Sequence, residues 1–205
     1  MSIPLKSFPT LPKKRYEDVR PDIKTGDLLL CSGTGVFSKF IQKATGSIWS
    51  HVAFVIRLDT IDRVMVLESV EPIGVRTVPL SHYVRNYKGD DHGYFGRILI
   101  ARHREMEYAS DKKLHKMSQF AVDLFGYPYD KDEILRIAKR IGQSMFGFGS
   151  NEVKRDREYI CSEYVWECFH KLGISVHYDP RGFIAPKDFA RPAGVKAVAH
   201  IAVKD

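Results

Sequence analysis

Segments typical of β-strands fill the first half of the chain, and segments typical of α-helices fill most of the second half. The strand-like segments are short apolar runs rich in β-branched residues, at 27–31, 50–58, 63–70, 74–80, 97–103 and, near the C-terminus, 196–203. The helix-like segments carry apolar residues three and four positions apart, at 110–124, 130–145 and 160–172. Because strands and helices are grouped rather than alternating, the pattern predicts an α+β fold. In such a fold an antiparallel sheet or partial barrel packs against helices.

The length and composition of the chain indicate one globular domain. Its 205 residues are 44% hydrophobic and 28% charged, which is close to the average of globular proteins and excludes a disordered or fibrous chain. We find no internal repeat and no linker long enough to divide the sequence. Residues 1–25 are rich in proline and charge, so we interpret them as an N-terminal arm or lid and residues 26–205 as the folded domain. No sequence feature indicates an oligomeric state.

The net charge of +7 raises nucleic acid or an acidic membrane as a partner. The basic residues are scattered, however, and the longest basic run is Lys13-Lys14-Arg15. We therefore expect a solvated surface and no nucleic-acid partner. The N-terminus lacks an apolar stretch of signal-peptide length, and no window reaches the roughly 18 apolar residues of a membrane span. These observations predict a cytoplasmic protein with no integral membrane segment.

The cysteines limit the chemistry further. Cys31, Cys161 and Cys168 are an odd number without a C-x-x-C pair, so neither a disulfide framework nor a zinc site is expected. Cys168 falls on the apolar face of the third helix-like segment and is interpreted as a core residue. Cys161 opens that segment, where unpaired backbone N–H groups and the helix dipole favour an anion such as a thiolate. Position alone leaves two interpretations of Cys161 open, a nucleophile or a small packing residue.

A nucleophilic cysteine needs a base, and His51 is the candidate among eight histidines. It is the second residue of the most apolar strand-like segment, 50–58, whereas most of the other histidines lie among charged or loop residues. A histidine at the entrance of a strand also has a purely structural interpretation. The expected strand pairing favours the functional interpretation.

That pairing places a carboxylate next to His51. If the turn at 59–62 preserves the hairpin register, Leu58 lies opposite Arg63 and Ala53 lies opposite Glu68. His51 is then the diagonal neighbour of Glu68 on the same side of the sheet, within reach of a long side chain. A buried carboxylate must be paired or hydrogen-bonded, and an imidazole N–H satisfies it. A register shifted by one residue would separate them to opposite faces.

Other motifs are weak. Gly33-Thr34-Gly35 follows a strand-like segment, but Ser38 stands where a dinucleotide fingerprint has glycine or alanine, and no βαβ pattern surrounds it. His51, Glu68 and Cys161 lack the close-spaced pair typical of zinc ligands. We therefore expect no cofactor and no metal.

Four short motifs, taken in order, resemble a known family. They are Gly26-Asp27-Leu28-Leu29-Leu30, Ser50-His51-Val52-Ala53-Phe54-Val55, Leu67-Glu68-Ser69 and Tyr159-Ile160-Cys161-Ser162-Glu163-Tyr164-Val165. Over roughly residues 25 to 200 the chain resembles the circularly permuted branch of the NlpC-type cysteine peptidases, the papain-like YiiX group. The order, with histidine first and cysteine last, makes the resemblance fairly specific, although each motif alone is short.

The resemblance implies a circularly permuted papain-like fold in which the sheet precedes the nucleophile helix. It also implies Cys161 as nucleophile, His51 as general base and Glu68 as the residue that orients His51. On this basis 26–205 is the catalytic domain, and Trp49 and Tyr164 are candidates for lining the substrate pocket, although both residue types more often serve in packing.

The function implied is that of a cysteine amidase or peptidase. Relatives of this kind cleave amide bonds in bacterial cell-wall peptides, so a small peptide or amino-acid-containing substrate is expected, with a thioester intermediate on Cys161. Two alternatives stay open. One is a lipid-directed acyltransferase or thioesterase of the lecithin retinol acyltransferase type, and the other is a non-catalytic binding module on the same scaffold.

Overall fold

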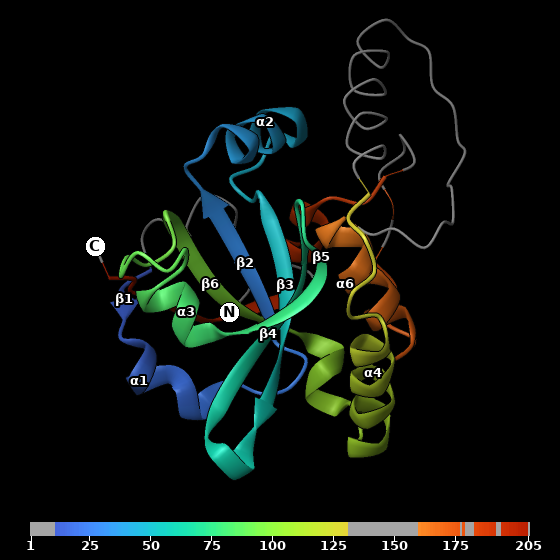
Figure 1. Ribbon diagram of the computed structural model, residues 1–205. Coiled ribbons are helices and arrows are strands. Elements are labelled where there is room, and N and C mark those ends of the chain that lie inside the picture. Colours follow the sequence, from blue (N-terminus) through green and yellow to red (C-terminus); the bar gives the residue numbers. More distant parts are fainter. Residues whose placement is uncertain (1–10, 131–159, 177, 179–182, 192–193, 205) are drawn as a thin grey trace, which may run out of the picture.

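The computed structural model describes residues 11–130, 160–176, 178, 183–191 and 194–204. Within them, seven strands form one open sheet in the order β1-β7-β6-β2-β3-β4-β5 (Figure 1). The strands are β1 (Lys13–Lys14), β2 (Leu28–Gly33), β3 (His51–Leu58), β4 (Arg63–Val70), β5 (Gly74–Pro79), β6 (Gly96–His103) and β7 (Val195–Ile201). All neighbours pair antiparallel except β1 and β7, which pair parallel. The predicted segments β2 to β7 are confirmed, and β1 adds a short edge strand that was not predicted.

The hairpin register predicted for β3 and β4 is confirmed. Leu58 lies opposite Arg63 and Phe54 opposite Leu67. The connection is a single 3-10 turn, η3 (Asp59–Ile61), closed by Asp62 in the left-handed conformation at φ 48°. Because aspartate is among the non-glycine residues that tolerate this conformation, the turn closes without shifting the register.

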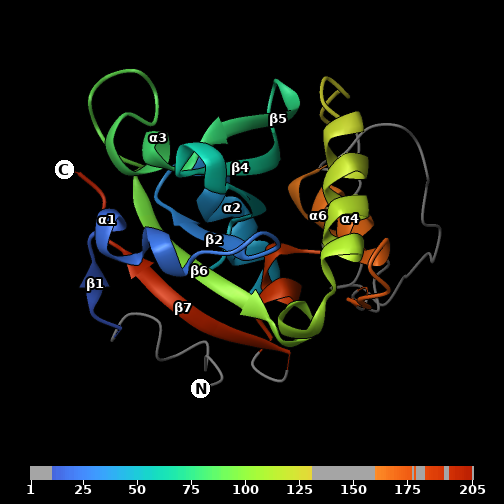
Figure 2. The ribbon, with the colours of Figure 1, turned by 90° about the horizontal axis from the view of Figure 1, so that it is seen from below.

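Both faces of the sheet are buried, which explains why the central strand β2 is a continuous apolar run. Leu28 and Leu30 face one core cluster, and Leu29 and Cys31 face the other. Figure 1 shows α4 (Asp111–Asp123) and α6 (Cys161–His170) on one side, and α1 (Tyr16–Val19) and α3 (Leu80–Arg85) on the other. Figure 2 shows the same arrangement from below.

Aromatic packing fixes α6 on the sheet. Phe54 of β3 is fully buried between Tyr164 and Phe169 of α6, with ring centroids 5.9 and 6.3 Å away. The Tyr164 hydroxyl donates a hydrogen bond to the carbonyl oxygen of Ala121 in α4, at 2.9 Å. The start of α6, where Cys161 lies, is therefore held in a fixed place relative to β3.

Three of the described helices were not expected from the sequence. They are α1 in the N-terminal segment, α2 (Val36–Thr45), which follows β2, and α3, which follows β5. The remaining short elements are the 3-10 turns η2 (Arg20–Asp22), η4 (Arg104–Tyr108) and η5 (Pro186–Ala190). The predicted helices at 110–124 and 160–172 correspond to α4 and α6, whereas the one predicted at 130–145 lies outside the described residues apart from its first position.

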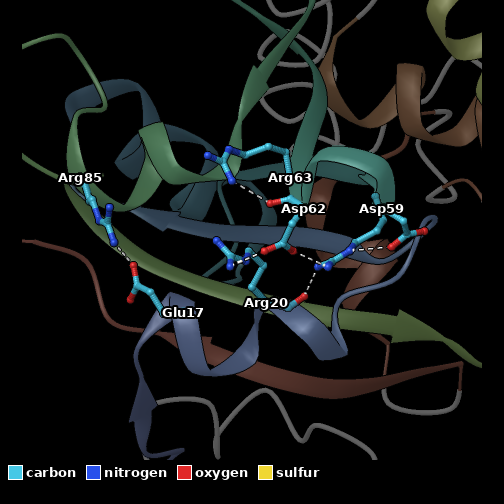
Figure 3. A network of polar contacts seen from close by, with 7 residues as sticks. Glu17, Arg20, Asp59, Asp62, Arg63 and Arg85 are labelled. Atoms are coloured by element: carbon cyan, nitrogen blue, oxygen red, sulfur yellow. Dashed lines mark hydrogen bonds and ion pairs between the residues drawn. The ribbon is translucent and has the colours of Figure 1, made fainter.

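The described part of the predicted N-terminal arm packs onto the sheet. Tyr16, Val19 and Ile23 are 4%, 3% and 1% exposed and belong to the core cluster on the α3 side. Charged groups tie this segment to the β3–β4 hairpin (Figure 3). There the Asp62 carboxylate pairs with Arg57 at 2.6 Å and with Arg20 at 2.5 Å. A boundary of the catalytic domain at residue 25 stays a prediction.

This network predicts a modest and salt-sensitive contribution to stability. Asparagine, like aspartate, tolerates the left-handed conformation, so Asp62→Asn should leave the turn intact and remove only the negative charge that Arg20 and Arg57 share. We expect the free energy of unfolding to fall by ~1 kcal/mol. Asp59→Asn is the control, since Asp59 is 87% exposed and pairs with Arg57 alone. Urea unfolding at low and high salt measures both, and an equal loss from the two variants would contradict the assignment.

Candidate active site

His51 is the first residue of β3, and the residue before it fixes its position. The backbone N–H of Ser50 donates to the Cys31 carbonyl oxygen at 2.9 Å, and the Ser50 hydroxyl accepts from the Gly33 N–H at 2.9 Å. Cys31 lies opposite His51 in the ladder between β2 and β3. The imidazole is thereby placed at the end of the strand, with 15% of its side chain exposed.

His51 and Glu68 are hydrogen-bonded, as the predicted register requires. Nε2 of His51 lies 2.8 Å from Oε2 of Glu68, whose side chain is fully buried. Because Nε2 binds the carboxylate, Nδ1 is the imidazole nitrogen left to serve another group. Cys161 lies close enough to raise the pKa of the imidazole, and it lines the same cavity as His51. The structure therefore brings together the three residues predicted for catalysis.

Cys161 is the first residue of α6 and is 6% exposed. The first turn of this helix is held in place by two hydrogen bonds from flanking residues. The Ser162 hydroxyl donates to the Ile184 carbonyl oxygen at 2.8 Å, and the Ile160 N–H donates to the Glu163 carboxylate at 3.2 Å. The first N–H groups of a helix have no partner within it, so they are available to an anion beside the thiol.

Electrostatics favour the charged forms of His51 and Glu68. Burial on its own lowers the pKa of His51, but the hydrogen bonds and charges of Cys161 and Glu68 outweigh it and raise the pKa to about 10. Burial on its own raises the pKa of Glu68, but His51, Arg76 and Tyr83 outweigh it and lower the pKa. The site therefore favours an imidazolium against a carboxylate.

The other two cysteines have a different environment. Cys31 and Cys168 are fully buried, and desolvation raises the pKa of each thiol well above its usual range. Their thiols stay protonated near neutral pH, so Cys161 is set apart from both by its place beside His51.

Cys161 lies between two cavities. The larger has a volume of about 380 Å³ and includes His51, Cys161 and, around its mouth, Phe37, Glu71, Tyr87, Lys88 and Phe95. The smaller, of about 40 Å³, is an apolar recess on the other side of Cys161, lined by Phe40, Ile41, Ala44, Phe183 and Pro186 among others. A third cavity of about 690 Å³ lies between the β3–β4 hairpin and α4 and includes no member of the constellation. The larger of the two cavities at Cys161 has a size that accommodates a small molecule or a peptide fragment.

Trp49 and Tyr164 were predicted as candidates for lining the substrate pocket. The structure places both in the core, at 0% exposure, and neither is among the residues that line the two cavities at Cys161. The face of α6 that carries Tyr164 turns toward Phe54 on the sheet, which leaves only the start of the helix open to the cavity. Their burial favours a packing role. The aromatic side chains that line the two cavities belong instead to α2 and to the chain after α3. None of them was predicted from the sequence as a site residue.

Comparison with known proteins agrees with this geometry. A family model described as "Permuted papain-like amidase enzyme, YaeF/YiiX, C92 family" matches residues 22–181. The chain belongs to this family. Its α+β architecture, with six of the seven described strands before α6, is the permuted papain-like fold. No curated protein matches the chain.

A solved structure of low sequence identity has the same fold. It is described as "metalloprotein yiiX from Escherichia coli O157:H7", with a TM-score of 0.61 and 21% identity, and the match covers 88% of this chain and 98% of that one. Among the residues that the structure of the present chain describes, no group of three or more His, Cys, Asp or Glu side chains is arranged to hold a metal ion.

No helix in the described part of the chain is long and apolar enough to cross a membrane.

The raised pKa of His51 gives a direct prediction. In an NMR titration the His51 ring should change protonation near pH 10 instead of near 6.5, and Glu68→Gln or Cys161→Ala should each lower the midpoint. Burial lowers the pKa of His103, so its titration below 6.5 is an internal control. The stability that the charged ring contributes is complete below about pH 6.5 and lost as the pH rises through about 10. A wild-type midpoint near 6.5 would refute the pairing.

Proposed function

We propose that this protein is a cysteine hydrolase that cleaves amide bonds, with Cys161 as nucleophile, His51 as general acid and base, and Glu68 as the orienting carboxylate. The observation that carries the proposal is the hydrogen bond between His51 and a fully buried carboxylate, with Cys161 beside the imidazole at the start of a helix and both residues lining one cavity. Membership of an amidase family supports it.

The acylation step follows from these positions. The Cys161 thiolate attacks the carbonyl carbon of the substrate, and a carbon–sulfur bond forms as the carbonyl oxygen becomes an oxyanion. N–H groups in the first turn of α6 stabilise this oxyanion. The carbon–nitrogen bond then breaks, and the His51 imidazolium gives its proton to the departing amine. A thioester on Cys161 and a neutral imidazole result.

The second half of the cycle regenerates the enzyme. Neutral His51 takes a proton from water, and the hydroxide formed attacks the thioester carbonyl carbon. The carbon–sulfur bond breaks, a carboxylic acid leaves, and Cys161 and His51 return to the thiolate–imidazolium pair. Through both halves Glu68 keeps Nε2 of the ring bonded and Nδ1 turned toward Cys161.

The cavity favours a small substrate. Its volume of about 380 Å³ suits a fragment of a few residues, and the mixture of Glu71, Lys88 and aromatic rings suits a polar amide better than a long hydrocarbon chain. Fragments of bacterial cell-wall peptides are the class that the family resemblance suggests. An acyltransferase would share the acylation step and differ only in giving the acyl group to an alcohol or amine rather than to water.

Selective alkylation tests the assigned nucleophile and base together. We expect iodoacetamide near neutral pH to modify one cysteine of the folded protein, Cys161, and His51→Ala to slow the reaction by about 100-fold. Cys168→Ala, seven positions along the same helix, is the matched control and should leave the rate unchanged. Peptide mass spectrometry locates the label. Equal labelling of all three cysteines, or a rate that His51→Ala does not change, would contradict the proposal.

A further inference from the structure

The carboxylate of Glu68 receives more hydrogen bonds than orienting His51 requires. Oε2 accepts from the Tyr83 hydroxyl as well as from His51. Oε1 accepts from two nitrogens of Arg76, Nε at 3.0 Å and a terminal nitrogen at 2.9 Å. Four donors from three elements thus surround one fully buried side chain.

The residues that donate to Glu68 come from different elements of the fold. Arg76 lies directly opposite Glu68 in the ladder between β4 and β5. Tyr83 is on α3, which directly follows β5, and its side chain is fully buried against the rings of Tyr87 and Tyr94, at 4.8 and 5.6 Å between centroids. The hydroxyl of Tyr83 is therefore held in place by packing, whereas the guanidinium of Arg76 is 28% exposed at the edge of the sheet.

Such a set of donors has a specific electrostatic effect. Transferring an ionised carboxylate into a protein interior costs several kcal/mol, and the usual response of an isolated buried group is to bind a proton. A protonated Glu68 would no longer favour the imidazolium and would lose the acceptor that fixes the ring. Hydrogen bonds from Tyr83 and Arg76 stabilise the ionised form and restrict both carboxylate oxygens to one orientation.

We propose that Tyr83 and Arg76 are positioning residues for the hydrolase: together they hold Glu68 as an oriented carboxylate, so that His51 keeps its proton and directs Nδ1 at Cys161. The proposal rests on the proposed function of this site. Neither residue touches the thiol, so both act through Glu68 and His51.

Among the described residues, few further charged or titratable groups face Glu68. Besides the three donor residues, the thiol of Cys31 on β2 and the hydroxyl of Tyr87 just beyond α3 are close enough for its charge to raise their pKa values. The ring of Tyr87 packs against that of Tyr83, and Tyr87 also lines the large cavity. A line of side chains therefore leads from the cavity through Tyr83 and Glu68 back to Cys161.

The test is a direct titration of the Glu68 carboxyl by carbon-13 NMR, with Glu68→Gln to assign the signal. Tyr83→Phe keeps the ring packing and removes one donor, so the Glu68 pKa should rise by about one unit. Arg76→Gln removes two donors and the charge and should raise it further, whereas Arg76→Lys keeps the charge and should have an intermediate effect.

Reactivity is measured on the same variants. The rate of Cys161 alkylation by iodoacetamide should fall by about tenfold in Tyr83→Phe, and the acid limb of its pH profile should move to higher pH with the Glu68 titration. Tyr16→Phe, which removes a hydroxyl from the same core cluster away from the site, and Arg97→Gln, an exposed arginine on β6, are the matched controls.

The outcomes separate this proposal from the proposed function. A Glu68 titration that neither Tyr83→Phe nor Arg76→Gln moves would overturn the positioning role, even if Cys161 reacts as expected. A uniform fall in alkylation rate without movement of the acid limb would also overturn it, because a merely structural defect has that signature. An inert Cys161 in the wild type would instead refute the hydrolase, whatever the Glu68 titration shows.

Discussion

A carboxylate kept ionised inside the protein is the constraint on which the candidate site depends. Glu68 has no exposed surface, and its charge is stabilised by donors from β3, β5 and α3. Its negative charge and the neighbouring Cys161 outweigh the effect of burial on His51 and raise the pKa of the imidazole, so the site favours an imidazolium. A neutral Glu68 would remove one of these two sources of stabilisation.

The fold supplies this arrangement through two rigid contacts. The β3–β4 hairpin keeps His51 and Glu68 in register, because Asp62 closes its turn in the left-handed conformation. Phe54, three residues after His51 on the same strand, packs against two rings of α6 and holds the helix that begins with Cys161. One strand thus positions both His51 and Cys161, although more than a hundred residues separate them in the sequence.

Local patterns were sufficient to predict strands β2 to β7, the hairpin register and the three residues at the site, whereas the short edge strand β1 was missed. Arg76 was within reach of the same reasoning, since a preserved register between β4 and β5 places it opposite Glu68. Tyr83 was not, because its contact with Glu68 depends on how α3 folds back over the sheet. The helix α2 was missed although Phe37, Phe40, Ile41 and Ala44 are spaced as on one helix face. Those side chains line the cavities rather than the core.

The central claim is that Cys161 carries an acyl group during turnover. Intact-mass spectrometry of protein quenched with acid during reaction with p-nitrophenyl acetate measures this directly. We predict one added acetyl group, located on Cys161, removed by hydroxylamine and absent in Cys161→Ala, with release to water faster than to an added alcohol. Release mainly to the alcohol would indicate an acyltransferase. Acetylation that persists in Cys161→Ala, or no acetyl group at any time, would contradict the account.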